Sequence, residues 1–289
     1  MERPLLEYLE IPITDRCNLR CNGCCEMSNL DICKKEHTFE GFVKDLRRMS
    51  ELFSGIGKIR IMGGEPLLVA RLPEYVAAAR EIFPDSDIRV VTNGLLIPSV
   101  AESVLDAVRD AGCGFDISCY PPTKKKLREI ESALENKGIP YHVTPIRWFF
   151  RAISETPHGD PGRAYRNCLF SYCHSLRDGK LSGCSYAQLG ERLNTAYGLS
   201  LPEKDCIDIH TTELDGAGIK KLLDSPHVFC AFCARGLLPI RWSDASTRPP
   251  KVSDWVAPDN ILNTRLLPAA TRLVKPAAEF IRSKIQNGG

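Results

Sequence analysis

The 289-residue chain is 43% hydrophobic and 26% charged, with a formal net charge of +2. This is the composition of a globular protein, and the small net charge gives no reason to expect nucleic acid or an acidic membrane as partner. No apolar run reaches the ~20 residues that span a bilayer, and the N-terminus lacks a signal pattern, so we expect a cytoplasmic protein. Its thirteen cysteines are then more often metal ligands or catalytic thiols than disulfides.

The predicted elements alternate between strand and helix. Strands are predicted at 8–13, 58–62, 87–92, 114–119 and 140–148, and helices at 39–53, 73–83, 101–111 and 123–136. This alternation is typical of an α/β fold with a parallel sheet and right-handed crossovers. We therefore expect a partial (β/α)6-type barrel over residues 1–152.

The regular alternation of predicted strands and helices ends in the later part of the chain. We expect a small α+β appendage over residues 153–258, with a hairpin turn at Asp178-Gly179, because Asp-Gly between two short β-prone runs favours such a turn. Residues 259–289 read as a mostly amphipathic helical segment. The sequence thus predicts three consecutive regions.

Polar stretches follow the predicted strands. Cys17, Cys21 and Cys24 come directly after the first strand with C-x3-C-x2-C spacing. Three such thiolates can hold three irons of a cubane cluster and leave the fourth iron open, whereas a structural zinc site is closed by four ligands. Later strands end at Gly63–Pro66, Thr92-Asn93, Ser118-Cys119 and Arg147. Because the carboxyl ends of parallel strands meet at one edge, we expect one site there.

These features resemble the radical S-adenosylmethionine (SAM) superfamily over roughly residues 5–150. The cysteine spacing is similar to its cluster loop, and residues 63–66 to its GGEP motif. The resemblance implies a 4Fe–4S cluster whose open iron binds SAM, release of a 5′-deoxyadenosyl radical, and a reducing partner such as flavodoxin or ferredoxin. The residue before the third cysteine is usually aromatic in this family. Here it is Gly23, so another residue has to contact the adenine.

The resemblance also implies which residues bind SAM. The candidates are Gly63, Gly64, Glu65 and Pro66 for the amino group, Thr92, Asn93 and Ser118 for the ribose and methionine groups, and Arg147 as a clamp for the carboxylate. A surface position for Arg147 is the equal alternative.

The C-terminal third resembles the SPASM/twitch regions carried by a subset of these enzymes. Four cysteines are candidate ligands of a second, closed 4Fe–4S cluster: Cys168, Cys184, Cys230 and Cys233. Their number is that of the twitch form, and the layout resembles that of deoxy-scyllo-inosamine dehydrogenases. Cys173 and Cys206 are possible substitutes, and zinc is an alternative occupant of the same four cysteines.

The resemblance predicts an iron–sulfur oxidoreductase that dehydrogenates a small hydroxylated substrate, such as a sugar or aminocyclitol. The radical takes hydrogen from the carbon, a base takes the hydroxyl proton, and the second cluster accepts the electron. An epimerase is the nearest alternative, with Cys119 as hydrogen donor, although strand alternation turns Cys119 toward the helices. Peptide maturation is less favoured because the first strand begins within ten residues of Met1. A non-catalytic electron carrier or metal scaffold is the alternative outside enzymes.

Overall fold

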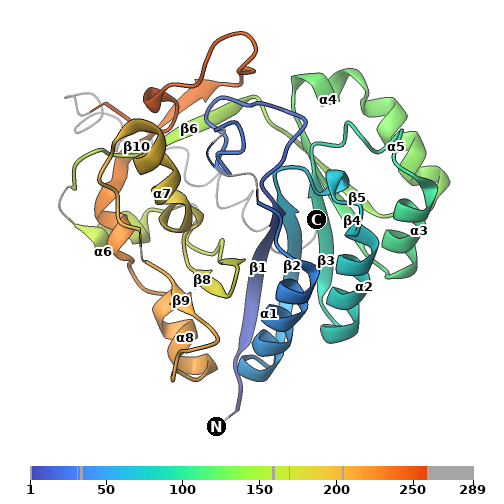
Figure 1. The fold of residues 1–289 in the computed structure, drawn as a ribbon, viewed down its shortest axis with the longest axis horizontal. Coiled ribbons are helices and arrows are strands. Elements are labelled where there is room, and N and C mark those ends of the chain that lie inside the picture. Colours follow the sequence, from blue (N-terminus) through green and yellow to red (C-terminus); the bar gives the residue numbers. More distant parts are fainter. Residues whose placement is uncertain are drawn as a thin grey trace.

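The chain has a mixed α/β fold built on a parallel sheet (Figure 1). The computed structural model describes residues 2–30, 32, 35–157, 160–168, 170–203 and 205–258. The first five strands are β1 (Leu5–Thr14), β2 (Gly55–Gly63), β3 (Asp87–Thr92), β4 (Gly114–Cys119) and β5 (Tyr141–Pro145). Each pairs in parallel with the next. The predicted fold class and the parallel sheet are confirmed.

Five helices connect these strands. They are α1 (Phe39–Leu52), α2 (Leu72–Ile82), α3 (Glu102–Asp110), α4 (Pro121–Lys125) and α5 (Leu127–Asn136). The hydroxyl oxygen of Thr38 accepts the N–H of Gly41 at 3.1 Å and so caps α1. The predicted helix at 123–136 is instead two helices, because Pro121 opens a turn earlier and Lys126 departs from helical geometry (φ −108°, ψ 8°).

The two faces of the parallel sheet differ in chemistry. Buried residues such as Ile11, Ile61 and Val90 form the apolar face, which packs against α1, α2, α3 and α5. The opposite face carries charged residues, including Glu10 and Arg60, which lie side by side in the β1–β2 register. Parallel sheets are normally apolar on both faces because helices cover both. The polar face therefore marks an interior that an apolar core does not fill.

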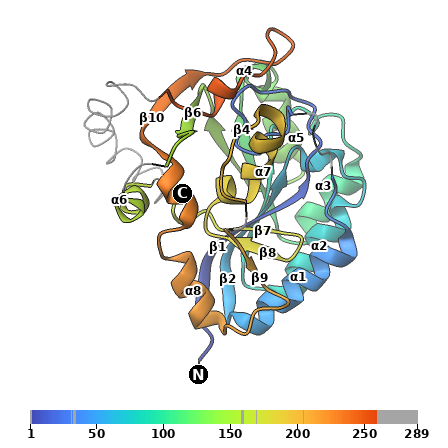
Figure 2. The same ribbon diagram turned by 60° about the vertical axis from the view of Figure 1, so that its left-hand side comes forward.

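The chain after β5 adds a second region. Its elements are β6 (Trp148–Ile153), α6 (Pro161–Arg166), β7 (Ser175–Arg177), β8 (Lys180–Ser182), α7 (Ser185–Tyr197), β9 (Ile207–Asp208), α8 (Gly216–Leu223) and β10 (Cys233–Arg241). β7 pairs in parallel with β1, so the sheet order is β5-β4-β3-β2-β1-β7-β8-β9 (Figure 2). Among the described strands this sheet is open, with β5 and β9 as its edges.

The predicted strand at 140–148 is wrong in its second half. β5 ends at Pro145, and its ladder with β4 finishes with the N–H of Ile146, which donates to the carbonyl of Cys119 at 3.0 Å. From Trp148 the chain instead pairs antiparallel with β10 in a separate two-stranded sheet. Arg147 therefore lies in the link between the two sheets.

Other predictions for the later part have different outcomes. The hairpin is confirmed, since Asp178 and Gly179 join β7 to β8 with φ values of 49° and 73°. The predicted terminal helix at 259–289 lies outside the described residues. The division at residue 152 stays a prediction. In the described part of the chain, no helix combines the length and apolar character needed to cross a bilayer.

Candidate cofactor site at the strand ends

The cysteine loop follows β1 at the carboxyl edge of the sheet. Burial raises the pKa of the Cys17 thiol to about 12 and also raises those of Cys21 and Cys24. The three thiols lie close enough for the charge of Cys24 to raise the pKa values of both Cys17 and Cys21 further. Three neighbouring thiols that are at least partly buried cannot all ionise readily without a compensating cation, so this donor set fits an iron–sulfur cluster.

The geometry of a cluster differs from that of a single ion. Within the described residues, no group of three or more His, Cys, Asp or Glu side chains is arranged to hold one metal ion. In a cubane each thiolate binds a different iron, so the ligands of a cluster need not converge on one point.

The two glycines after β2 pack against the cysteine loop. The N–H of Gly64 donates to the carbonyl of Thr14 at 2.7 Å, and the N–H of Glu65 donates to that of Arg16 at 2.8 Å. A Cβ atom at Gly63 or Gly64 would collide with these same two carbonyl groups. The glycines are thus required for contact between two loops. Their approach to SAM, together with that of Pro66, stays a prediction.

Glu65 joins the ends of β2 and β3. Its carboxylate is fully buried and accepts the Thr92 hydroxyl at 2.7 Å, the N–H of Asn93 at 2.9 Å and the N–H of Leu67 at 3.1 Å. Burial raises its pKa to about 7. Asn93 in turn points its amide at Cys17, with 3.9 Å between Nδ2 and Sγ. The structure therefore brings Glu65, Thr92 and Asn93 together beside the first cysteine.

Two of the candidate residues lie elsewhere. Arg147 is exposed in the link between β5 and β6, so it does not end a strand at this site. Cys119 is buried, and the charges that act on it come from Lys124 and Glu131 on the helix side of the sheet. The carbonyl of Arg147 accepts the N–H of Trp242 at 2.9 Å, and a role of its side chain at the site stays a prediction. Ser118 keeps its position on the polar face of β4.

The second set of cysteines is assembled from separate segments. The charges of Cys168 and Cys230 raise the pKa of Cys184. The charges of Cys168, Cys184 and Cys230 raise the pKa of Cys233. A hydrogen bond with Cys233 lowers the pKa of Cys230 to about 7, whereas burial raises that of Cys184 to about 12. The four predicted thiols therefore lie near one another. Cys173 borders this group.

The two possible substitutes have other neighbours. The charges of Glu10 and Arg60 act on Cys173 more strongly than that of Cys168 does. Cys206 is surrounded by Lys180, Asp205 and Asp208. Cys173 therefore faces the polar side of the sheet, and Cys206 lies away from the four thiols.

Buried ion pairs join the two cysteine regions. Arg177 on β7 contacts Asp15 at 2.6 Å and Glu26 at 3.1 Å, both on the cysteine loop. Arg192 on α7 also contacts Asp15, at 2.8 Å. Tyr186 on α7 lies between the regions. Burial is the main cause of its raised pKa, and the charges of cysteines from both regions raise it further: Cys25, Cys184, Cys24 and Cys233. The two regions are therefore adjacent.

A charged network occupies the polar face of the sheet. Arg60 contacts the Tyr8 hydroxyl at 2.9 Å, Asp116 at 3.0 Å and Glu10 at 3.7 Å, and Tyr8 donates its hydroxyl proton to Glu10 at 2.8 Å. Burial raises the pKa of Glu10. Glu10 and Arg60 were not among the residues predicted from the sequence. The available signal was a charged residue at alternate positions of otherwise apolar parallel strands.

Comparison with known proteins identifies the first part of the chain. Residues 11–136 match the family model of the radical SAM superfamily. We call these matched residues the radical SAM domain. The cysteine loop and the GGEP motif lie within it, whereas the second group of cysteines follows it.

Several relatives are similar to about half of the chain. A GTP 3′,8-cyclase of Alkaliphilus oremlandii is 38% identical over 153 residues, which are 49% of this chain and 46% of the relative. That of a Sulfurovum species is 33% identical over 154 residues, 49% of this chain and 47% of the relative. The chain therefore spans about half the length of these curated relatives.

Solved structures also align with the chain. A crystal structure of BtrN in complex with AdoMet and 2-DOIA aligns with a TM-score of 0.47 and 17% identity, over 78% of this chain and 89% of BtrN. A structure of anSMEcpe with bound AdoMet aligns with a TM-score of 0.39 and 18% identity, over 48% of this chain and 43% of that protein.

Residues from inside and outside the radical SAM domain surround Gly23, where the family usually has an aromatic residue. Gly23 has φ of 77°, and a Cβ there would lie 2.6 Å from Cδ1 of Ile240 on β10 and 3.5 Å from Cβ of Phe149 on β6. Tyr120 lies with its ring 5.9 Å from that of Phe149 and 6.4 Å from that of Trp242. An aromatic group contributed by three segments thus stands beside the cysteine loop.

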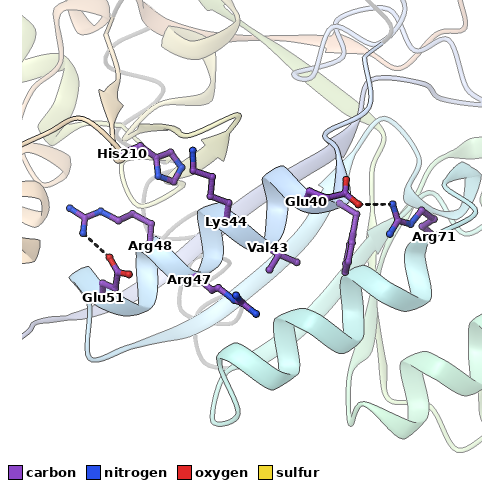
Figure 3. Close-up of a pocket in the computed structure, with 9 residues that line it drawn as sticks. Glu40, Val43, Lys44, Arg47, Arg48, Glu51, Arg71 and His210 are labelled. Carbon is purple, nitrogen blue, oxygen red and sulfur yellow. Dashed lines mark hydrogen bonds and ion pairs between the residues drawn. The ribbon is translucent and has the colours of Figure 1, made fainter.

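A groove of about 600 Å³ lies on the outer side of the radical SAM domain (Figure 3). Its lining residues are mainly on α1 and include Lys44 and Arg47. Arg48 pairs with Glu51, one turn along the same helix, at 2.8 Å (Figure 3). Since α1 covers the apolar face of the sheet, this groove is separated from the cysteine loop and the polar face, and it is not part of the candidate site.

Proposed function

We propose that this protein is a radical SAM enzyme that dehydrogenates a small hydroxylated substrate, such as a sugar or aminocyclitol, at the polar face of the sheet. When bound, the clusters and SAM supply a 5′-deoxyadenosyl radical and an acceptor for the electron left on the substrate. The observation that carries the proposal is the second group of thiols: Cys168, Cys184, Cys230 and Cys233 lie together in the region next to the cysteine loop.

The polar face supports a substrate with hydroxyl groups. Glu10, Arg60 and Asp116 offer acceptors and donors within one network, and hydroxyl groups satisfy both kinds of partner. The Glu10 carboxylate can accept a hydroxyl proton, since burial already raises its pKa and so favours the protonated form. Cys25, Cys173 and Tyr186 surround this interior from the loop and the second region.

Cyclisation of a nucleotide is the second candidate, and the sequence relatives favour it. Both GTP 3′,8-cyclases align with about half of this chain at above 30% identity. The charges at the polar face disfavour it, because Glu10, Asp116 and the nearby Glu26 would repel a triphosphate. An epimerase with Cys119 as donor is not supported by the position of that thiol.

The first experiment tests radical formation. Protein reconstituted without oxygen should contain about eight irons if two cubane clusters form, and should release 5′-deoxyadenosine from SAM on reduction with dithionite. If 5′-deoxyadenosine is released but no hydroxylated substrate changes, the protein has radical SAM activity and the proposed class of small hydroxylated substrates is rejected. No release would identify a carrier or scaffold.

The second experiment distinguishes the candidate reactions. Myo-inositol, glucosamine, 2-deoxystreptamine and GTP are each incubated with the reduced enzyme and SAM. A new carbonyl in a polyol or amino sugar, formed with one 5′-deoxyadenosine per product, supports dehydrogenation. Uptake of solvent deuterium without a carbonyl supports epimerisation, and consumption of GTP supports the cyclase. The Glu10→Gln variant should lower the yield of carbonyl product while leaving SAM binding unchanged.

A further inference from the structure

The segment after β10 covers the cysteine loop of the radical SAM domain, although it lies more than one hundred residues beyond the matched family region (Figure 1). The N–H of Asn22 donates to the carbonyl of Ser243 at 2.9 Å, and the N–H of Ala245 donates to that of Arg20 at 2.7 Å. Cys21 and Asp244 form an isolated antiparallel bridge. The segment is thus joined to the loop through its backbone.

Two indole groups from this segment donate to the loop, and they reach different acceptors. Nε1 of Trp242 lies 3.1 Å from Sγ of Cys21. Nε1 of Trp255 lies 2.7 Å from the carbonyl oxygen of Cys24. One indole therefore contacts a predicted iron ligand at its sulfur, and the other contacts only the backbone.

The Trp242 contact is held in place from both sides. The N–H of Trp242 donates to the carbonyl of Arg147 at 2.9 Å, which fixes the backbone where β6 and β10 begin to pair. Its ring lies beside that of Tyr120, with 6.4 Å between the ring centres. The indole N–H is therefore aimed at Cys21 by packing and by backbone pairing together.

A hydrogen bond to a cluster sulfur affects the redox state of the iron. The reduced cluster carries more negative charge, and a donor to a ligand sulfur stabilises that charge, so such bonds raise the reduction potential. Cys21 is only 6% exposed. Water therefore competes little with the indole for the sulfur, and the effect of one donor is large in such surroundings.

We propose that Trp242 is a positioning residue that sets the reduction potential of the cluster held by Cys17, Cys21 and Cys24. The inference rests on the cluster of the proposed function and is independent of the substrate. The region outside the radical SAM domain then determines how readily the cluster accepts an electron from the reducing partner.

The test compares Trp242→Phe with Trp255→Phe in the full chain without substrate. Both variants keep an aromatic ring and lose one indole donor to the same loop. The reduction midpoint of the cluster, followed by electron paramagnetic resonance during a redox titration, should move to a lower potential in Trp242→Phe and stay at the wild-type value in Trp255→Phe. An unchanged midpoint in Trp242→Phe, or equal shifts in both variants, would overturn the proposal.

A second measurement uses the unmutated protein in case a variant does not hold iron. With ¹⁵N at the indole nitrogens, the reduced cluster should show a ¹⁵N coupling, because the Trp242 nitrogen contacts a ligand sulfur. No coupling would also overturn the proposal. If the protein holds no cluster at these cysteines, the proposed function fails as well. If the cluster is present but shows no effect of Trp242, only the present proposal fails.

Discussion

The two groups of cysteines differ in how the chain brings them together. Cys17, Cys21 and Cys24 lie in one loop, which the backbone groups of residues 63–65 hold against the sheet. Cys168, Cys184 and the pair Cys230 and Cys233 come from three segments that meet only when β7, β8, α7 and β10 are in place. The first group thus depends on local loop structure, whereas the second depends on tertiary packing.

Removing each group separately should give the largest and most distinct effects. Replacing Cys17, Cys21 and Cys24 by Ala should abolish release of 5′-deoxyadenosine and reduce iron from about eight to about four per chain. Replacing Cys184, Cys230 and Cys233 by Ala should remove a similar amount of iron, keep 5′-deoxyadenosine release and abolish product formation. Iron analysis and chromatography measure both, and zinc in the second site would contradict the proposed electron acceptor.

Arg177 tests how far the two regions depend on each other. Arg177→Ala leaves Asp15 and Glu26 buried with one cation fewer, and breaking such a buried pair costs about 4 kcal/mol in the free energy of unfolding. Arg109→Ala is the control, because its pairs with Asp106 and Asp110 are on the surface and are worth less than about 1 kcal/mol. Urea unfolding measures both. Equal losses would show that the Arg177 contacts do not couple the regions.

The Gly64→Ala variant tests whether local packing of the two loops positions Cys17, Cys21 and Cys24. In Gly64→Ala the added Cβ collides with the carbonyl of Arg16, and the hydrogen bonds between the two loops are lost, for an expected cost of about 3 kcal/mol. Gly55→Ala, whose Cβ would lie 3.5 Å from Leu5 Cδ1, an ordinary contact, should change stability little. If Gly64→Ala is equally stable and binds iron normally, the packing of the two loops is not what shapes the site.

His174 adds a smaller, pH-dependent effect in the second region. Burial lowers its pKa from 6.5 to about 4, so the folded protein keeps it neutral while the unfolded chain takes up a proton. Its contribution to stability is complete above pH 6.5 and is lost as the pH falls toward 4, by about 2 kcal/mol at pH 5. His174→Gln should therefore lose less stability than the wild type between pH 7.5 and pH 5 in urea unfolding, whereas exposed His142→Gln should behave as the wild type.

Much of the fold could be predicted from the sequence because the parallel strands repeat one pattern. The strands β1 to β4 are rich in apolar residues and each precedes a helix, so this repeat identifies them. The fifth strand was predicted too long, because the apolar character of Trp148 and Phe149 is the same whether they continue β5 or begin β6. Only the partner strand, β10, distinguishes the two, and that partner lies far along the chain.

The candidate site was predictable where its residues are close in sequence. Cys17, Cys21 and Cys24 could be found from spacing alone, since a loop sets their separation. The contacts of Trp242 with Cys21 and of Arg60 with Asp116 join segments distant in sequence, and no spacing encodes them. The predicted place of Arg147 in the fifth strand was wrong because that strand ends at Pro145, and its role as a clamp stays a prediction.

The pairing of β7 with β1 has a consequence for how the protein can be divided. Glu10 on β1 donates its backbone N–H to the carbonyl of His174, just before β7, at 2.8 Å. A fragment that ended at residue 152 would leave this side of β1 with unpaired backbone groups, and open strand edges recruit other chains into aggregates. The radical SAM domain should thus precipitate when expressed alone, and production of a soluble protein requires the segment through β7.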